Sequence, residues 1–162
     1  MLNKKIFEAF SKGSGFFQHG HTYMGHPMAA AAGLAVQDVL RRDRLLDNVV
    51  AMGGHLQRRL EERFANHHHV GDIRGRGLFR GVELVSDCDS KKPFASDLKV
   101  NALVKCEAMA RGLCVYPMGG TIDGVNGDHV LIAPPFVVNQ EQIDTIVERL
   151  GDAVDAAVAS VK

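Results

Sequence analysis

The chain has 162 residues, of which 46% are apolar and 23% charged, and 19 basic residues balance 19 acidic ones. This balance argues against a nucleic-acid or polyanion partner. No apolar run approaches the roughly 20 residues of a membrane span, and the N-terminal stretch lacks a signal-peptide core. Cys88, Cys106 and Cys114 are odd in number and form no Cys-x-x-Cys pair. We therefore expect no disulfide framework and a cytoplasmic protein, with buried thiols at Cys106 and Cys114.

The first part of the chain predicts a short helix, a loop and a longer helix. Ile6, Phe7 and Phe10 have helical spacing, and the segment 11–15 (SKGSG) ends that pattern. Residues 16–27 (FFQHGHTYMGHP) are too polar and too rich in glycine for a core element. A helix is predicted from Pro27 to Leu40, because proline at the first helical position costs no hydrogen bond.

A second long helix is predicted from about Asp43, which is a suitable N-cap. Its opposite face carries charged residues that suit solvent. The apolar residues recur at three- and four-residue steps and form one stripe: Leu45, Leu46, Val49, Val50, Met52, Leu56, Leu60 and Phe64.

The pattern then changes to period two. Within residues 70–85 (VGDIRGRGLFRGVELV) we predict a strand from about Leu78, preceded by a bulge or a close backbone approach at Gly75 and Gly77. A helix follows over 97–111, capped by Ser96. A strand over 113–116, a glycine-rich turn over 117–128, a strand over 129–133 and a helix capped by Asn139 complete the chain.

This order of elements predicts an α+β fold, in which a small, largely antiparallel sheet is covered by helices. A weak boundary near residue 42 divides the chain into residues 1–42 and residues 43–162. The loop and helix of the first part are expected to belong to a larger unit, whereas the second part is expected to close on itself.

The loop before Pro27 is the strongest candidate site. Thr22 offers a hydroxyl and an amide, Gly20 and Gly25 allow the backbone to approach a ligand, and a helix N-terminus follows at once. These residues indicate a phosphate or carboxylate site. The alternative, a capped loop that only leads into a helix, stays open on these residues.

Four segments together carry a resemblance to a known family. They are FFQHGHTYMGHPMAAAAGLAVQDVL, IRGRGLFRGVELV, ARGLCVYP and GDHVLIAPPFVVNQEQID. The first resembles the F-x-H-G-x-T-Y-x-G-H-P segment of class III aminotransferases, which are pyridoxal-phosphate (PLP) enzymes of fold type I. The other three resemble strands and helices of the C-terminal small domain of that family, in the same order.

The resemblance implies particular roles for the loop. Thr22 and the backbone near His21 would bind the PLP phosphate of the partner subunit, and Gly20 would lie on the substrate side. The resemblance therefore implies a homodimer with the cofactor at the subunit interface. Residues 1–42 would be the tail of the large PLP-binding domain, and residues 43–162 the small domain. Amino transfer between an amine or amino acid and a keto acid would be the activity.

Two departures from the family pattern matter. The family's Schiff-base lysine and its pyridine-binding aspartate precede the H-G-x-T-Y motif, and Lys4 and Lys5 lie too close to the motif to be that lysine. No catalytic residue is therefore assigned, and the chain alone is expected to be inactive. Two positions where relatives carry a carboxylate-binding arginine are Tyr116 and Leu131 here. Tyr116 would then offer a hydroxyl to the substrate, or would simply pack at a strand end.

Two alternatives remain open for the whole chain. In the first, the chain is an interaction module without catalysis. In the second, it is a piece of a related PLP aminomutase or decarboxylase.

Several smaller features are interpreted structurally. His67, His68 and His69 are expected at a solvated helix end and not at a metal. The arginines of 74–80 are expected to belong to a strand more than to an anion site, and 117–128 to be a turn near the substrate mouth.

Overall fold

The computed structural model describes residues 3–161, which form two compact units, residues 3–39 and residues 40–161. In the first unit, helix α1 (Lys4–Lys12) begins after Asn3, whose side chain accepts a hydrogen bond from the Ile6 amide at 3.0 Å. Helix α2 (Pro27–Arg42) begins at the predicted proline and runs across the division into the second unit. The predicted short helix and the helix start at Pro27 are thus confirmed.

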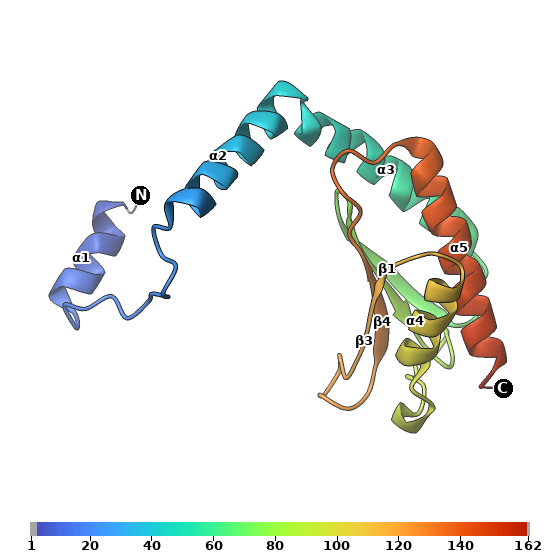
Figure 1. Ribbon diagram of the computed structural model, residues 1–162. Helices are drawn as coiled ribbons and strands as arrows, with labels where there is room; N and C mark the ends of the chain where they lie inside the picture. The colour runs from blue at the N-terminus through green and yellow to red at the C-terminus, as the bar shows by residue number, and fades with distance from the viewer. Residues whose placement is uncertain (1–2, 162) are drawn as a thin grey trace. The chain divides into compact units, whose positions relative to one another are not determined.

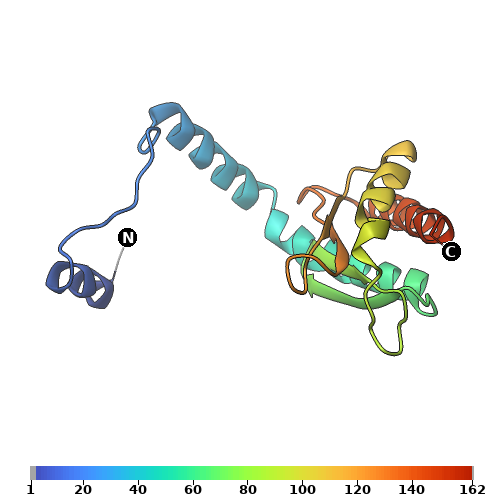
Figure 2. The same ribbon diagram turned by 90° about the horizontal axis from the view of Figure 1, so that it is seen from below.

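The second unit is an α+β fold, as predicted (Figure 1). Its strands are β1 (Val70–Arg76), β2 (Phe79–Leu84), β3 (Tyr116–Gly119) and β4 (Asp128–Ile132), in the sheet order β1-β2-β4-β3 with every pair antiparallel. Its helices are α3 (Leu45–Phe64), α4 (Val100–Ala110) and α5 (Gln140–Ala159), with a short 3₁₀ turn at Ser96–Leu98. Helices α4 and α5 lie on one side of the sheet (Figures 1 and 2).

The register of the sheet separates a core face from an outer face. Ile73, Val82, Val130 and Pro117 stand opposite one another across the four strands, and Val82 and Val130 are fully buried. Side chains alternate along a strand, so the residues between them point the other way. The core face packs against a continuous apolar cluster that the three helices supply: Leu56, Leu60, Phe64, Val100, Val104, Ala108, Ile143, Val147, Leu150, Val154 and Val158.

The segment 70–85 forms a hairpin and not the single strand that we predicted. The period-two signal was read from Leu78 onward, but the residues before it pair back as β1. The predicted close approach is confirmed, because a Cβ on Gly53 of α3 would lie 2.6 Å from the carbonyl carbon of Gly77. Arg80 joins the same elements, donating to the carbonyls of Gly75 at 2.7 Å and Gly53 at 3.2 Å.

The irregularity of the sheet lies away from Gly75 and Gly77. The register shift falls between Val70 and Asp72 and not at the two glycines of the hairpin.

Two of the arginines of 74–80 have structural roles, as expected. Arg74 pairs with the carboxylate of Asp72 at 2.6 Å. Together with the backbone bonds of Arg80, this pairing confirms the structural interpretation of these two side chains.

The starts of α3 and α4 differ from the prediction. Asp43 pairs with Arg42 and does not cap α3. Helix α3 begins after Arg44, whose backbone is left-handed with φ 51°. Helix α4 begins after Lys99 (φ 49°), which provides no side-chain cap, and not after Ser96. The amide of Asn101 donates instead to the buried carboxylate of Asp128, at 3.2 Å. This cap comes from a strand 27 residues away, so no local pattern reveals it.

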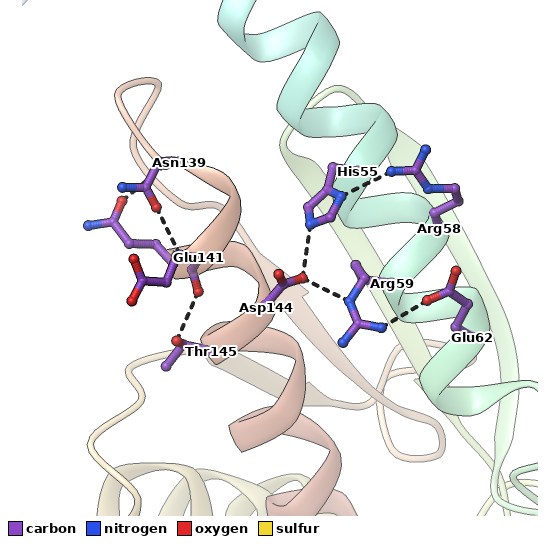
Figure 3. Close-up of polar contacts among 9 residues, drawn as sticks. His55, Arg58, Arg59, Glu62, Asn139, Glu141, Asp144 and Thr145 are labelled. Atoms are coloured by element: carbon purple, nitrogen blue, oxygen red, sulfur yellow. Dashed lines mark hydrogen bonds and ion pairs between the residues drawn. The ribbon is translucent and has the colours of Figure 1, made fainter.

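Helices α3 and α5 are joined by polar contacts along one seam (Figure 3). The Asp144 carboxylate of α5 contacts His55 Nε2 at 2.9 Å and Arg59 Nε at 2.8 Å. Farther along, Asp155 of α5 contacts His67 Nε2 at 3.0 Å and Arg63 Nη2 at 2.5 Å. These polar contacts hold the two long helices together, in addition to the apolar core that they share.

Three further expectations need correction. His67 and His69 are partly buried and have partners, since His67 pairs with Asp155 and His69 Nδ1 contacts the Val85 carbonyl at 3.1 Å, whereas His68 is exposed as expected. Cys106 and Cys114 are exposed free thiols, because Cys106 lies opposite the buried stripe of α4 and Cys114 follows the buried Leu113. The strand expected over 113–116 begins only at its last residue, Tyr116, and takes in the first residues of the expected turn.

Residues 3–161 lack two kinds of feature. None of the helices described is both long and apolar enough to cross a membrane. Over the same residues, no group of three or more histidine, cysteine, aspartate or glutamate side chains is arranged to hold a metal ion.

Candidate functional site

The candidate loop lies between α1 and α2 in the first unit. Its backbone is organised by short-range hydrogen bonds: the Met24 amide donates to the His21 carbonyl, and the His26 amide donates to the Tyr23 carbonyl, both at 3.0 Å. Gly25 adopts φ +76°, which a residue with a Cβ rarely takes. These turns lead the chain from the loop directly into the first turn of α2.

Side chains of the loop also contact one another. The rings of Tyr23 and His26 meet edge to face at 5.4 Å, and Phe17 meets Phe10 of α1 at 5.3 Å in the same manner. His26 Nδ1 also accepts the Ala29 amide at 3.4 Å and so caps the start of α2. The loop is therefore ordered locally, although its side chains are largely exposed.

The predicted residues Gly20, His21 and Thr22 are consecutive and exposed. Within the described part of the chain, the Thr22 hydroxyl and amide have no hydrogen-bond partner. The segment 16–26 carries no acidic side chain. A hydroxyl and amides without a nearby carboxylate suit a phosphate group. The residues present therefore fit the phosphate of PLP, and beside them the Met24 methyl lies 2.9 Å from where a Cβ on Gly20 would be.

Tyr116 belongs to the second unit, where it is the first residue of β3. It stands opposite Leu131 of β4 in the sheet register, and its side chain is 63% exposed. It is therefore not packed away at a strand end, and its hydroxyl is available to a ligand. The structure thus groups the three loop residues in one unit and holds Tyr116 in the other.

A hollow on the outer face of the sheet was not predicted from the sequence. It has a volume of about 270 Å³ and is lined by Arg74, Phe79, Gly81, Glu83, His129 and Leu131, among others. The alternation of residues along 79–84 would have placed Phe79, Gly81 and Glu83 on one face. The pairing of β2 with β4 was needed to bring His129 and Leu131 beside them.

Comparison with known proteins gives the same family that the motifs indicate. Residues 1–154 match the family described as aminotransferase class III. An uncharacterized aminotransferase of Schizosaccharomyces pombe is 47% identical over 99% of this chain and 35% of its own length. A putrescine–pyruvate aminotransferase of Pseudomonas aeruginosa is 32% identical over 99% of this chain and 33% of its own.

Solved structures agree with the sequence comparison. A transaminase from the marine bacterium Virgibacillus superposes with a TM-score of 0.85 at 31% identity, covering 99% of this chain and 36% of that one. An (S)-enantioselective omega-transaminase from Thermomicrobium roseum gives a TM-score of 0.81 at 30% identity, covering 97% of this chain and 33% of that one. The chain spans about a third of the length of these relatives.

The fold is accordingly that of the small domain of a PLP-dependent transferase of fold type I: a four-stranded antiparallel sheet with its helices. The family match covers nearly all of the sequence and includes both the loop around Thr22 and the sheet domain. The chain therefore belongs to the class III aminotransferase family.

Proposed function

We propose that this chain is the part of a PLP-dependent aminotransferase that binds the cofactor phosphate and forms part of the substrate wall. The observation that carries the proposal is the loop 16–26, where the Thr22 hydroxyl and amide have no partner in the described chain and no carboxylate is near in sequence. When bound, PLP supplies the electron sink for amino transfer. The substrates would be an amine or amino acid and a keto acid.

The loop residues would act by binding and orientation. Thr22 would donate its hydroxyl hydrogen to a phosphate oxygen, and the backbone near His21 would supply an amide. The turn at Thr22–Gly25 holds these donors in place before the phosphate arrives, which lowers the entropy cost of binding. In line with the family resemblance, we propose that the phosphate belongs to the cofactor of the partner subunit in a homodimer.

Gly20 and Tyr116 would contribute to the substrate wall. Gly20 is exposed, with the Met24 methyl in the space that a Cβ would take, and the hydroxyl of the exposed Tyr116 can hydrogen bond a polar substrate group. Tyr116 and Leu131 occupy positions where relatives carry an arginine. The wall described here would therefore recognise a substrate carboxylate less strongly than an arginine fork does.

We also propose that the 162-residue chain, assayed alone, transfers no amino group, because it has no lysine at the position that the family uses. Residues 1–42 would belong with the large PLP-binding domain and residues 43–162 would form the small domain. A cytoplasmic location is part of the same proposal.

A chimera tests this function. In the S. pombe relative, the segment that aligns with this chain is replaced by residues 1–162, and the parent protein selects the donor and acceptor from a panel of amines, amino acids and keto acids. We expect the chimera to retain PLP and to transfer amino groups. Thr22→Val should weaken PLP retention by about ten- to a hundredfold, the value of a hydrogen bond to a charged group.

Thr22→Ser is the matched control, because it keeps the hydroxyl, and it should retain PLP like the unchanged chimera. If Thr22→Val binds PLP as tightly as Thr22→Ser, the role of Thr22 is wrong. A folded chimera that retains no PLP would instead favour the interaction module without catalysis. Transfer by the isolated chain would overturn the assignment of no catalytic residue.

A further inference from the structure

The loop 120–127, which joins β3 to β4, contains the dipeptide Asn126–Gly127 (Figure 1). No other asparagine of the sequence is followed by glycine. The backbone nitrogen that follows an asparagine can attack the carbonyl carbon of the asparagine side chain, and glycine obstructs that approach least because it has no Cβ. Asn126 is therefore the asparagine of this chain that loses its side-chain amide most easily on chemical grounds.

The nitrogen of Gly127 is not used by the hydrogen bonds of the loop. Among residues 3–161 its amide has no acceptor, whereas the Gly127 carbonyl accepts the Thr121 amide at 3.4 Å and the Asn126 carbonyl accepts the Ile122 amide at 3.0 Å. Gly127 is buried, and the side chains of Thr121 and Ile122 lie 2.7 and 2.8 Å from where its Cβ would be. A base therefore reaches this nitrogen when the loop opens.

The neighbouring dipeptide Asp123–Gly124 shows the contrast. Its second residue is also glycine, but the Gly124 amide donates to the Gly120 carbonyl at 2.9 Å. An amide hydrogen that is held by an acceptor is lost less readily than a free one. The nitrogen of Gly124 is thus a poorer nucleophile than that of Gly127, and the structure separates two dipeptides that look alike in the sequence.

The side chain of Asn126 is held by the carboxylate of Asp123. Asp123 Oδ2 accepts from Asn126 Nδ2 at 2.8 Å, and Oδ1 accepts the amides of Asn126 at 2.7 Å and Val125 at 2.9 Å. These bonds, the one from the Asn126 amide first, lower the pKa of Asp123 to about 2, so the carboxylate is ionised at neutral pH. A side chain held at Nδ2 is not free to turn its Cγ toward the Gly127 nitrogen.

We propose that Asn126–Gly127 is a site of spontaneous deamidation and that Asp123 is a latch that slows the reaction in the folded chain. The Gly127 nitrogen bonds to Cγ of Asn126, the Cγ–Nδ2 bond breaks, and the hydrogen of the Gly127 nitrogen leaves with Nδ2 as ammonia. Water then opens the cyclic imide at either carbonyl, which gives aspartate or isoaspartate. The reaction consumes only water and is independent of PLP binding and of the proposed function.

The product would disturb the loop. Replacement of Asn126 Nδ2 by oxygen removes the donor to Asp123 and places two carboxylates side by side, where they repel each other. Isoaspartate also inserts a methylene into the main chain just before the buried Asp128, which accepts the Asn101 amide at the start of α4. The deamidated chain, separated by anion exchange, should therefore unfold at a lower urea concentration. An unchanged midpoint would contradict this effect on the loop.

Ageing of the 162-residue chain at mildly alkaline pH, followed by mass spectrometry of peptides, tests the site. In guanidinium chloride, where the latch is absent, we expect Asn126 to react before every other asparagine, including Asn66, which is exposed in the fold. In the folded chain Asn126 should react about tenfold more slowly or less. Earlier reaction at another asparagine, or a rate at Asn126 that is as high in the folded chain as in guanidinium chloride, overturns the proposal.

Asp123→Ser tests the latch itself. The serine hydroxyl can still accept the Val125 amide in the turn, but it is too short to hold the Asn126 side chain, so the rate in the folded chain should rise by about threefold or more. Asp89→Ser is the matched control, since it removes an exposed carboxylate from another loop, and it should leave the rate unchanged. Equal rates in the two variants overturn the role of Asp123. If Asp123→Ser does not fold, the comparison of the unchanged chain with and without guanidinium chloride decides.

Discussion

The carboxylate of Asp144 on α5 lies 2.9 Å from Nε2 of His55 on α3 (Figure 3). His55 Nδ1 lies 3.0 Å from Nη2 of Arg58, which can only donate, so Nδ1 is the acceptor and Nε2 carries the hydrogen. Asp144 also accepts from Arg59. One carboxylate therefore joins two donors of α3 to α5.

The first prediction concerns this carboxylate. Burial raises the pKa of Asp144, but hydrogen bonds from His55 and Arg59 outweigh burial and lower it below the ordinary 3.8. A lowered folded pKa gives stability that is complete above 3.8 and is lost as the pH falls through the folded value. Asp144→Asn should therefore reduce the free energy of unfolding at neutral pH, with a difference from the unchanged chain that shrinks in acid.

Urea unfolding at several pH values measures this difference. Glu148→Gln is the control, since Glu148 is an exposed carboxylate on the same helix with no ion pair among the described residues. It should change stability little at any pH. A difference for Asp144→Asn that stays constant into acid would contradict the prediction.

The second prediction concerns Asp128, whose pKa is shifted in the opposite direction from that of Asp144. Burial raises the pKa of Asp128, against the hydrogen bond from the Asn101 amide and the nearby His129. A raised folded pKa means that the contribution of this group is complete below 3.8 and is lost as the pH rises through the folded value. Asp128→Asn keeps an oxygen that can accept from Asn101 but carries no charge.

We therefore expect the stability of Asp128→Asn, relative to the unchanged chain, to increase as the pH rises from about 4 to about 7. The same urea series measures it, and Asp144→Asn provides the comparison, because its relative stability should decrease over the acid range. If both variants change in the same direction, the assignment for Asp128 is wrong.

The third prediction uses two adjacent glycines of α3. A Cβ at position 53 would lie 2.6–2.7 Å from the backbone of Gly77, whereas a Cβ at position 54 would have nothing within 4 Å. Gly53→Ala forces the hairpin away from the helix and should cost about 1–3 kcal/mol. Gly54→Ala should stabilise the helix by about 0.5–1 kcal/mol. Thermal unfolding of the two variants side by side checks the sign, and similar effects would contradict the close contact.

Local features of the sequence predicted some elements well. Pro27, Asn139 and the stripe of α5 were predictable because the signals lie within a few residues of one another. The start of α4 was not, since Asp128 caps it from another strand. The hairpin was missed because the strand signal of 70–76 is weak by itself and depends on pairing with β2.

For the candidate site too, features that depend on neighbouring residues were predictable, and features that depend on distant ones were not. The residues around Thr22 indicated an anion site, but the cofactor entered only through the family resemblance. The hollow at Gly81 was out of reach, because it depends on the register of β2 against β4. His67 was placed in solvent because its partner, Asp155, lies 88 residues away.

The last prediction concerns the start of α5. Asn139 accepts the Gln142 amide at 2.9 Å, and the Gln142 side chain accepts the Asn139 amide at 3.0 Å, which is a complete capping box. Asn139→Ala should cost about 1 kcal/mol, and Asn139→Asp, which keeps an accepting oxygen, should cost much less. Because both bonds order the same turn, the double variant with Gln142→Ala should lose less than the two single variants added together. Urea unfolding of the unchanged chain, Asn139→Ala, Gln142→Ala and the double variant gives this coupling, and strict additivity would show that the two bonds act independently.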